Sequence, residues 1–238
     1  MLKQGEQDGI KQVICTPHIL SKQDMDREDE VIALFETLKT KACSARISME
    51  LHLGSELYVQ PDLELDRRIS TLAQNGRYFL VEFSMGMIPD FVAKRFFEMT
   101  RSDQTAIIAH PERYSTLLNN PDKARDFVAR GALLQINAGS LLGVFGTRVK
   151  TLSERLMDAN LVHFVASDAH DCKMRPLKLS EAYRMVEQKW GGERARDLMV
   201  NNPLKVLAAE PIRTGTYQPV ESPAKPSIRE RLRSVLSK

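Results

Sequence analysis

The segment TAIIAHPERY, from Thr105 to Tyr114, begins as a strand and ends in reactive side chains. Its apolar part, TAIIA, is short and bounded by polar residues, which predicts a buried strand. His110 follows at once, and Arg113 comes three residues later. Catalytic groups of (β/α) barrels gather where the parallel strands end, so this segment predicts a site in a fold of that class.

Four further apolar runs end in the same way. Each is expected to form a strand, and each brings side chains that can bind metals to its carboxyl end. These side chains are His18, Glu56, Glu82, Asp168 and His170. Because parallel strands point their carboxyl ends to one face of a barrel, we expect them to lie together with His110. Six metal-binding side chains in such places are hard to attribute to chance.

Helical segments separate these strands. They are expected at 26–43, 89–99, 120–131, 147–160 and 179–190, where apolar spacing or helix-end signals occur. The alternation predicts an α/β fold with a parallel sheet or barrel. From residue 211 proline, serine and threonine become frequent, and a basic segment ends the chain. We therefore expect one domain over 1–210 and a flexible basic tail over 211–238.

Composition limits the class of protein. The chain has 238 residues, of which 42% are hydrophobic and 27% charged, as in an ordinary globular protein. The net charge of +3 is too small to predict nucleic-acid binding, and no apolar run is long enough to cross a membrane. Three widely spaced cysteines argue against a disulfide framework or a thiolate zinc site. A reduced, cytoplasmic protein is expected.

The candidate ligands are imidazoles and carboxylates without a thiolate. Such a set suits manganese, zinc or iron, and the spacing does not choose among them. A carboxylate can bridge two cations, and a multi-metal site can stabilise the attacking and leaving oxygens of phosphate-ester hydrolysis. Arg113 could bind the phosphate through two parallel hydrogen bonds. His52 is expected to face outward or pack within its strand, and His163 to be a core imidazole.

The blocks TPH, GSELYV, VEF, IIAHPERY, GALLQINAGSLLGVFG and HFVASDAH resemble the PHP (polymerase and histidinol phosphatase) family. They are most similar to its capsule- and exopolysaccharide-operon branch, the metal-dependent protein-tyrosine phosphatases, over about residues 9–208. The resemblance implies a distorted (β/α)₇ barrel of the TIM type and hydrolysis by metal-activated hydroxide. It implies up to three ions, commonly Mn²⁺, with Zn, Fe or Mg as further candidates. The implied substrate is phosphotyrosine on the tail of a bacterial tyrosine autokinase that controls polysaccharide export.

The resemblance also implies a role for each residue. Glu56 would bridge two ions, and Glu82 and His110 would complete one of these two sites. The remaining roles fall on Asp168 for the other bridged ion, His18 and His170 for the third ion, and Arg113 for the phosphate.

One part of the family pattern is expected to be missing. Family members begin with a strand that ends in Asp-x-His-x-His, whereas this sequence has only the end of the following helix, LKQGEQDG. The resemblance therefore implies six of seven strands, with the first absent, one complete metal set and two incomplete ones. A start site assigned too far downstream, a truncated chain or a degraded homologue would each account for this.

Two other functions stay open on the sequence. A small-molecule phosphoesterase of the PHP family, acting for instance on histidinol phosphate, would use the same ions with a different pocket rim. A catalytically impaired protein that binds the kinase tail would result if the missing ligands abolish activity. A monomer and a homo-oligomer are both compatible with the sequence.

Overall fold

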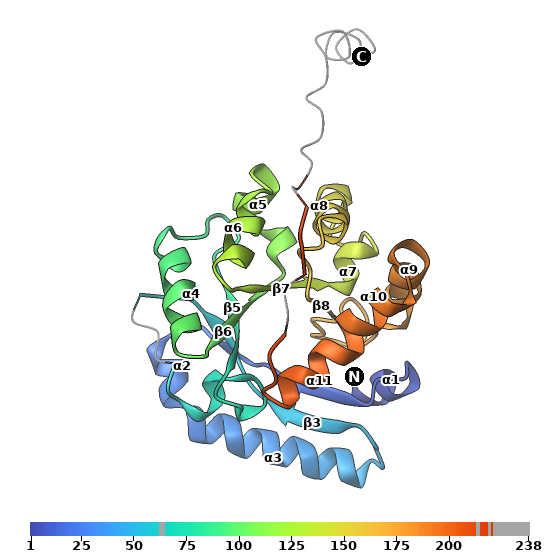
Figure 1. Ribbon diagram of the computed structural model, residues 1–238. Helices are drawn as coiled ribbons and strands as arrows, with labels where there is room; N and C mark the ends of the chain where they lie inside the picture. Colours follow the sequence, from blue (N-terminus) through green and yellow to red (C-terminus); the bar gives the residue numbers. More distant parts are fainter. Residues whose placement is uncertain (62–64, 213–214, 219, 221–238) are drawn as a thin grey trace, which may run out of the picture.

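The computed structural model describes residues 1–61, 65–212, 215–218 and 220, in which helices surround a set of parallel strands (Figure 1). The larger sheet has the order β2-β4-β5-β6-β7-β8, and β1 pairs with β3 in a second sheet. Every pairing is parallel. The strands are β1 (Gln12–Cys15), β2 (His18–Ile19), β3 (Glu50–Leu53), β4 (Glu56–Tyr58), β5 (Tyr78–Glu82), β6 (Thr105–Ala109), β7 (Leu133–Asn137) and β8 (Phe164–Ala166).

The two sheets are continuous with each other except for short breaks between β1 and β2 and between β3 and β4. Between β1 and β2 the ladder continues, because the Cys15 carbonyl accepts from the Gly54 amide at 2.9 Å and the Pro17 carbonyl from the Glu56 amide at 3.1 Å. The eight strands therefore follow six paths, the number that the resemblance implies. Within the described residues no strand pairs with the outer edges of β2 and β8. Parallel α/β architecture is confirmed, and closure into a (β/α)₇ barrel stays a prediction.

Helices or helical turns lie between the six strand paths, and the five helices that were expected are present. In Figure 1 the longest of them, α3, lies along β3. No helix in the described part of the chain combines the length and apolarity that a membrane crossing needs. The α-helices are α1 (Leu2–Gln7), α2 (Lys22–Asp26), α3 (Glu28–Ser44), α4 (Phe91–Arg101), α5 (Ser115–Asn119), α6 (Lys123–Ala129), α7 (Ala138–Leu141), α8 (Thr147–Asp158), α9 (Ser180–Trp190), α10 (Gly192–Arg196) and α11 (Asn202–Leu207). Short helical turns are η1 (Arg68–Ser70), η2 (Leu72–Gln74), η3 (Pro111–Arg113) and the π-helical η4 (Asp197–Asn201).

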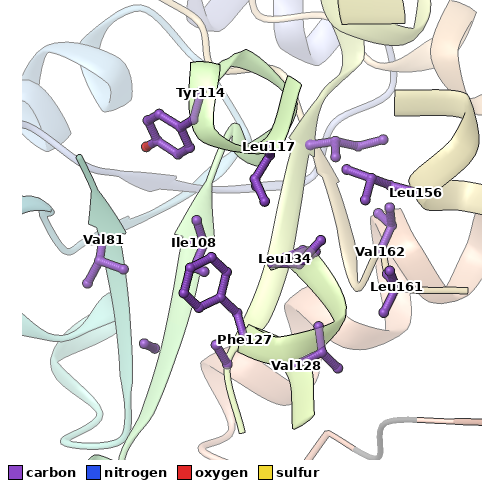
Figure 2. Close-up of a cluster of buried hydrophobic side chains, with 14 of the residues drawn as sticks. Val81, Ile108, Tyr114, Leu117, Phe127, Val128, Leu134, Leu156, Leu161 and Val162 are labelled. Atoms are coloured by element: carbon purple, nitrogen blue, oxygen red, sulfur yellow. The ribbon is translucent and has the colours of Figure 1, made fainter. Parts of the chain in front are cut away.

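Both faces of the central strands are apolar. On one face Val81, Ile108 and Leu134 are register partners on β5, β6 and β7, and they pack with Phe127 of α6 (Figure 2). On the other face the row Leu80, Ile107 and Leu133 belongs to a second buried cluster that includes Tyr78 and Phe164. Strands covered on both faces need continuous apolar runs, which explains the sequence of TAIIA.

The first part of the segment predicted as a flexible tail, 211–238, contacts the domain, and the tail itself stays a prediction. Tyr217 packs against the main core, and Val220 is only 3% exposed. The Gln218 amide donates to the Ala159 carbonyl at 3.0 Å, directly after α8. These contacts bury apolar side chains that a composition-based reading of 211–238 treats as unpartnered. Residues 221–238, which make up most of the predicted tail, lie outside the described residues.

Candidate metal centre

The predicted ligands come from neighbouring strands that run in one direction. His18 and Glu56 are register partners on β2 and β4. Glu82 is the last residue of β5, and His110 directly follows β6. Because parallel strands end at the same face, residues that are far apart in sequence meet there.

The first group of ligands is in direct contact. Nδ1 of His18 lies 2.7 Å from Oε1 of Glu82, and Nε2 of His110 lies 2.9 Å from Oε1 of Glu56. Nε2 of His110 is also 3.8 Å from Oε2 of Glu82. One ligand atom from each of His18, Glu56 and Glu82 lies within 4.8 Å of the others. Two buried carboxylates and two imidazoles thus converge on one small space.

The second group adjoins the first. The rings of His18 and His170 have centroids 5.9 Å apart, and Nδ1 of His170 is 3.7 Å from Oδ1 of Asp168. Oδ2 of Asp168 lies 3.7 Å from Nη1 of Arg113. The structure therefore brings all the predicted site residues into one connected cluster, formed by His18, Glu56, Glu82, His110, Arg113, Asp168 and His170.

Two of these residues have an unusual backbone. His110 has φ of 36° and Asp168 has φ of 48°, both in the left-handed region. For residues other than glycine this conformation costs about 1–3 kcal/mol, and such residues concentrate at functional sites. At His110 the left-handed turn ends β6 and leads directly into η3, which carries Arg113.

The cluster is suited to cations. The hydrogen bond to Glu82 raises the pKa of His18, and the charges of Glu56, Glu82 and Asp168 add to this effect against the opposing effect of burial. Glu56 and Glu82 are 4% and 7% exposed, and buried carboxylates require a compensating positive charge. Imidazole nitrogen and carboxylate oxygen are the donors that manganese, zinc and iron bind. The donor set therefore fits a metal centre.

The sequence did not identify Arg175. Its guanidinium contacts Oδ2 of Asp168, which also accepts from Nδ2 of Asn137 at 2.6 Å. Arg175 and Arg113 both face the ring of Phe145, with their guanidinium carbons 6.0 Å and 4.6 Å from its centroid. The available signal was an arginine five residues after His170, in a loop with no periodic pattern.

Glu112 is a second residue that the sequence analysis did not use. Its carboxyl group is fully buried and accepts from the Asn137 amide at 3.0 Å and from Oγ of Ser140 at 2.5 Å. Burial raises the pKa of Glu112 although these hydrogen bonds oppose the shift. Glu112 thereby ties η3 to the start of α7, and so holds the turn between His110 and Arg113.

The two histidines left out of the site lie elsewhere. His52 is on β3 and contacts Gln12 and Glu50. His163 is 5% exposed and its Nδ1 accepts from the Leu134 amide at 3.1 Å, which confirms a core imidazole. Burial, with a contribution from Arg194, lowers the pKa of His163 to about 3, so its ring is neutral.

A cavity of about 610 Å³ adjoins the cluster. Its lining includes His18, Glu56, Asp168 and His170, and it extends between β1 and β8 to apolar residues such as Ile107 and Phe164. Four of the candidate metal ligands thus border a hollow and are not sealed in the core.

Comparison with known proteins identifies relatives of the chain. The family model for capsular polysaccharide synthesis, CpsB/CapC, matches residues 1–208. The chain is 32% identical to the putative tyrosine-protein phosphatase CapC of Staphylococcus aureus, over 89% of this chain and 84% of that protein. It is also 32% identical to the tyrosine-protein phosphatase YwqE of Bacillus subtilis, over 81% of this chain and 77% of that protein.

A solved structure shares the fold. It comes from the crystal structures of YwqE from Bacillus subtilis and CpsB from Streptococcus pneumoniae, described as unique metal-dependent tyrosine phosphatases. The TM-score is 0.87 at 31% identity, with 93% of this chain and 90% of the other covered. The match over nearly the whole of both chains shows that the two proteins have the same fold. The chain belongs to the CpsB/CapC family of capsular polysaccharide synthesis proteins.

Proposed function

We propose that the chain is a metal-dependent protein-tyrosine phosphatase, that is, a phosphoric monoester hydrolase. The observation that carries the proposal is the cluster itself, in which imidazoles and carboxylates adjoin two guanidinium groups. Imidazoles and carboxylates bind cations, and guanidinium groups bind phosphate oxygens. A phosphate ester is therefore the ligand that fits both kinds of group. The relatives named as tyrosine-protein phosphatases support the same reaction.

The residues that would hold the ions are His18, Glu56, Glu82, His110, Asp168 and His170. Mn²⁺ is the proposed ion, in up to three positions, with Zn, Fe or Mg as alternatives of the same ligand chemistry. When bound, such cations lower the pKa of water and stabilise the charge that develops on the phosphoryl oxygens. Glu56 has the central place, because it pairs with His18 in register and contacts His110.

The two arginines would orient the phosphate. Arg113 and Arg175 are both partly exposed and both approach Oδ2 of Asp168, so their exposed N–H groups are available to an anion. A guanidinium binds two phosphate oxygens at once and keeps its charge at all working pH values. The Asp168 carboxylate would hold the two guanidinium groups close together until a phosphate accepts hydrogen bonds from their free N–H groups.

A protein substrate fits the surroundings of the site better than a small molecule. The side chains of His18 and His170 are each 41% exposed, so the centre is open. Met85 and Met87, in the loop after β5, and Met174, in the loop after β8, are exposed apolar side chains at the same end of the strands. We propose phosphotyrosine on the tail of a bacterial tyrosine autokinase as the substrate. Three free cysteines are consistent with a cytoplasmic location.

Hydrolysis of a phosphotyrosyl peptide tests the proposal. The chain would be assayed with Mn²⁺ and with a chelator, and histidinol phosphate would be tested as a competing substrate. We expect peptide hydrolysis that needs the metal and falls in R113A. A hydrolysis rate that neither the chelator nor R113A changes would contradict the proposal. A preference for histidinol phosphate would favour the small-molecule enzyme. Metal analysis of the purified chain gives the number of ions.

A further inference from the structure

The ring of Phe145 lies against both candidate phosphate-binding arginines. The guanidinium carbon of Arg113 is 4.6 Å from the ring centroid and that of Arg175 is 6.0 Å from it. A cation within about 6 Å of an aromatic face is attracted by the negative charge of the ring face. Two positive groups that would otherwise repel each other therefore lie near one aromatic ring.

The ring of Phe145 is held in place by its own turn and by α7. Phe145 belongs to the turn between α7 and α8, in which the Val144 amide donates to the Gly139 carbonyl at 2.8 Å. A Cβ atom at Gly139 would come within 3.2 Å of Cε2 of Phe145, so the ring packs directly on α7. Gly143 and Gly146, with φ of 86° and 88°, allow the turn on either side of the ring. The position of Phe145 is thus set by backbone and not by the arginines.

The edges of the two guanidinium groups are held separately. Both guanidinium groups approach Oδ2 of Asp168 with an N–H edge, and both lie near the ring of Phe145. The carboxylate and the ring thus contact different parts of each group. Nε of Arg175 is buried and has no hydrogen-bond partner within the described residues, so this atom does not orient the guanidinium through a hydrogen bond. A long arginine side chain loses much rotamer freedom on ordering, and a fixed ring supplies that order before an anion arrives.

We propose that Phe145 is a positioning residue that aligns Arg113 and Arg175 for a phosphate group. The inference rests on the proposed function for its biological meaning, because a phosphate ester is the ligand that both arginines would bind. Phe145 would act through the two arginines and not through contact with the reacting atoms. Its contribution comes from the face of the ring, so a side chain of equal bulk without that face should not replace it.

Arginine modification by phenylglyoxal, with inorganic phosphate as the protecting ligand, tests the proposal in the full chain without a catalytic assay. Peptide mapping by mass spectrometry follows Arg113 and Arg175 separately. In F145L we expect both arginines to react faster, and the phosphate concentration for half protection to rise about tenfold, the size expected from losing two such contacts. F145Y keeps a ring and should stay within about twofold of the parent chain. V144A, in the same turn, is the matched control and should change neither quantity.

Fluorinated phenylalanines at position 145 separate a charge effect from packing, and they cover the case in which F145L fails to fold. Stepwise fluorination weakens the ring face at nearly constant volume, so we expect phosphate protection to weaken stepwise. Equal protection and equal arginine reactivity across the fluorinated series would overturn the proposal. Loss of phosphotyrosine hydrolysis in the parent chain, with the dependence on Phe145 intact, would overturn the proposed function and leave this inference standing.

Discussion

Nδ1 of His18 lies 2.7 Å from Oε1 of Glu82, although the two residues are 64 positions apart in the chain. Each stands near the end of a different strand of the larger sheet, with β4 between them. The contact joins an exposed imidazole to a carboxylate that is 7% exposed, and this carboxylate also approaches His110. Glu82 therefore lies between two imidazoles, that of His18 on β2 and that of His110 after β6.

E82Q should separate metal binding from folding. Glutamine has nearly the same shape and keeps a hydrogen-bond acceptor for His18, but it lacks the charge that a divalent cation needs. We expect metal affinity and phosphatase activity to fall at least about 100-fold while the thermal midpoint of the metal-free protein changes little. Metal content and kcat/KM would be measured beside H52Q, which alters a histidine outside the cluster. Full metal content in E82Q would refute the assignment.

R113K and R175K test the geometry of phosphate binding. Lysine keeps the positive charge but cannot donate two parallel hydrogen bonds to one phosphate, so charge alone is separated from geometry. We expect each substitution to lower kcat/KM by about 100-fold, the usual effect of one oxyanion donor. R148K is the control, because Arg148 lies on α8 and contacts Asn119 at the surface. Activity of R113K or R175K equal to that of R148K would exclude a role for that guanidinium.

Removal of metal should lower stability as well as activity. A ligand that binds only the folded chain stabilises it by about 2.7 kcal/mol when present at 100 times its dissociation constant. For a chain of this size that amounts to a rise of about 5–10 °C in the thermal midpoint. Thermal unfolding with Mn²⁺ and with a chelator would show this shift in the parent chain. The shift should vanish in E82Q, and a shift of equal size there would mean that the ion binds elsewhere.

The strands and their terminal ligands were predictable because both depend on local sequence. An apolar run such as TAIIA identifies a strand covered on both faces, and a parallel sheet then brings all its strand ends together. That is why His18 and His170 could be grouped before their positions were known, although their roles as ligands stay predictions. The fold class follows from the same alternation of strands and helices.

Residues that act through long-range packing could not be found in this way. Arg175 comes from a loop without periodicity, and its link to Phe145 depends on the fold and not on spacing. The sequence did not predict the packing of Tyr217 or the burial of Val220, for a related reason. Composition describes the average of a segment, whereas two apolar side chains on the right surface are enough to hold it.

Asp8 should give the domain a dependence on pH. Its carboxylate accepts from the Leu179 and Ser180 amides at 2.6 Å and 2.8 Å, and from Oγ of Ser180, and so caps α9 from the distant end of α1. Burial alone would raise the pKa of Asp8, but the hydrogen bonds from Ser180 and the amides outweigh it and lower the pKa. A lowered pKa means that the stabilisation is present above the unfolded value of about 3.9 and is lost as the pH falls through the folded value.

D8A should therefore be destabilised at neutral pH and not in acid. We expect a loss of about 1–2 kcal/mol at pH 7, the typical effect of removing a helix cap, which shrinks as the pH falls below about 4. Urea unfolding at several pH values would measure it. D66A, at an exposed position, is the control for loss of one negative charge. The same deficit in D8A at pH 7 and in acid would show that the charge of Asp8 is not what stabilises the cap.

G131A should be among the most damaging small substitutions outside the site. Gly131 has φ of 91°, and a Cβ atom there would lie 2.2 Å from Cγ2 of Thr100 on α4. Strain of the left-handed backbone and the steric clash together should cost about 3 kcal/mol in the free energy of unfolding. Adding T100S removes the clashing methyl group, since the next nearest atom is 3.5 Å away, but leaves the backbone strain. Denaturant unfolding should show that the double variant regains about half of the loss, and no recovery would mean that the backbone conformation alone requires glycine.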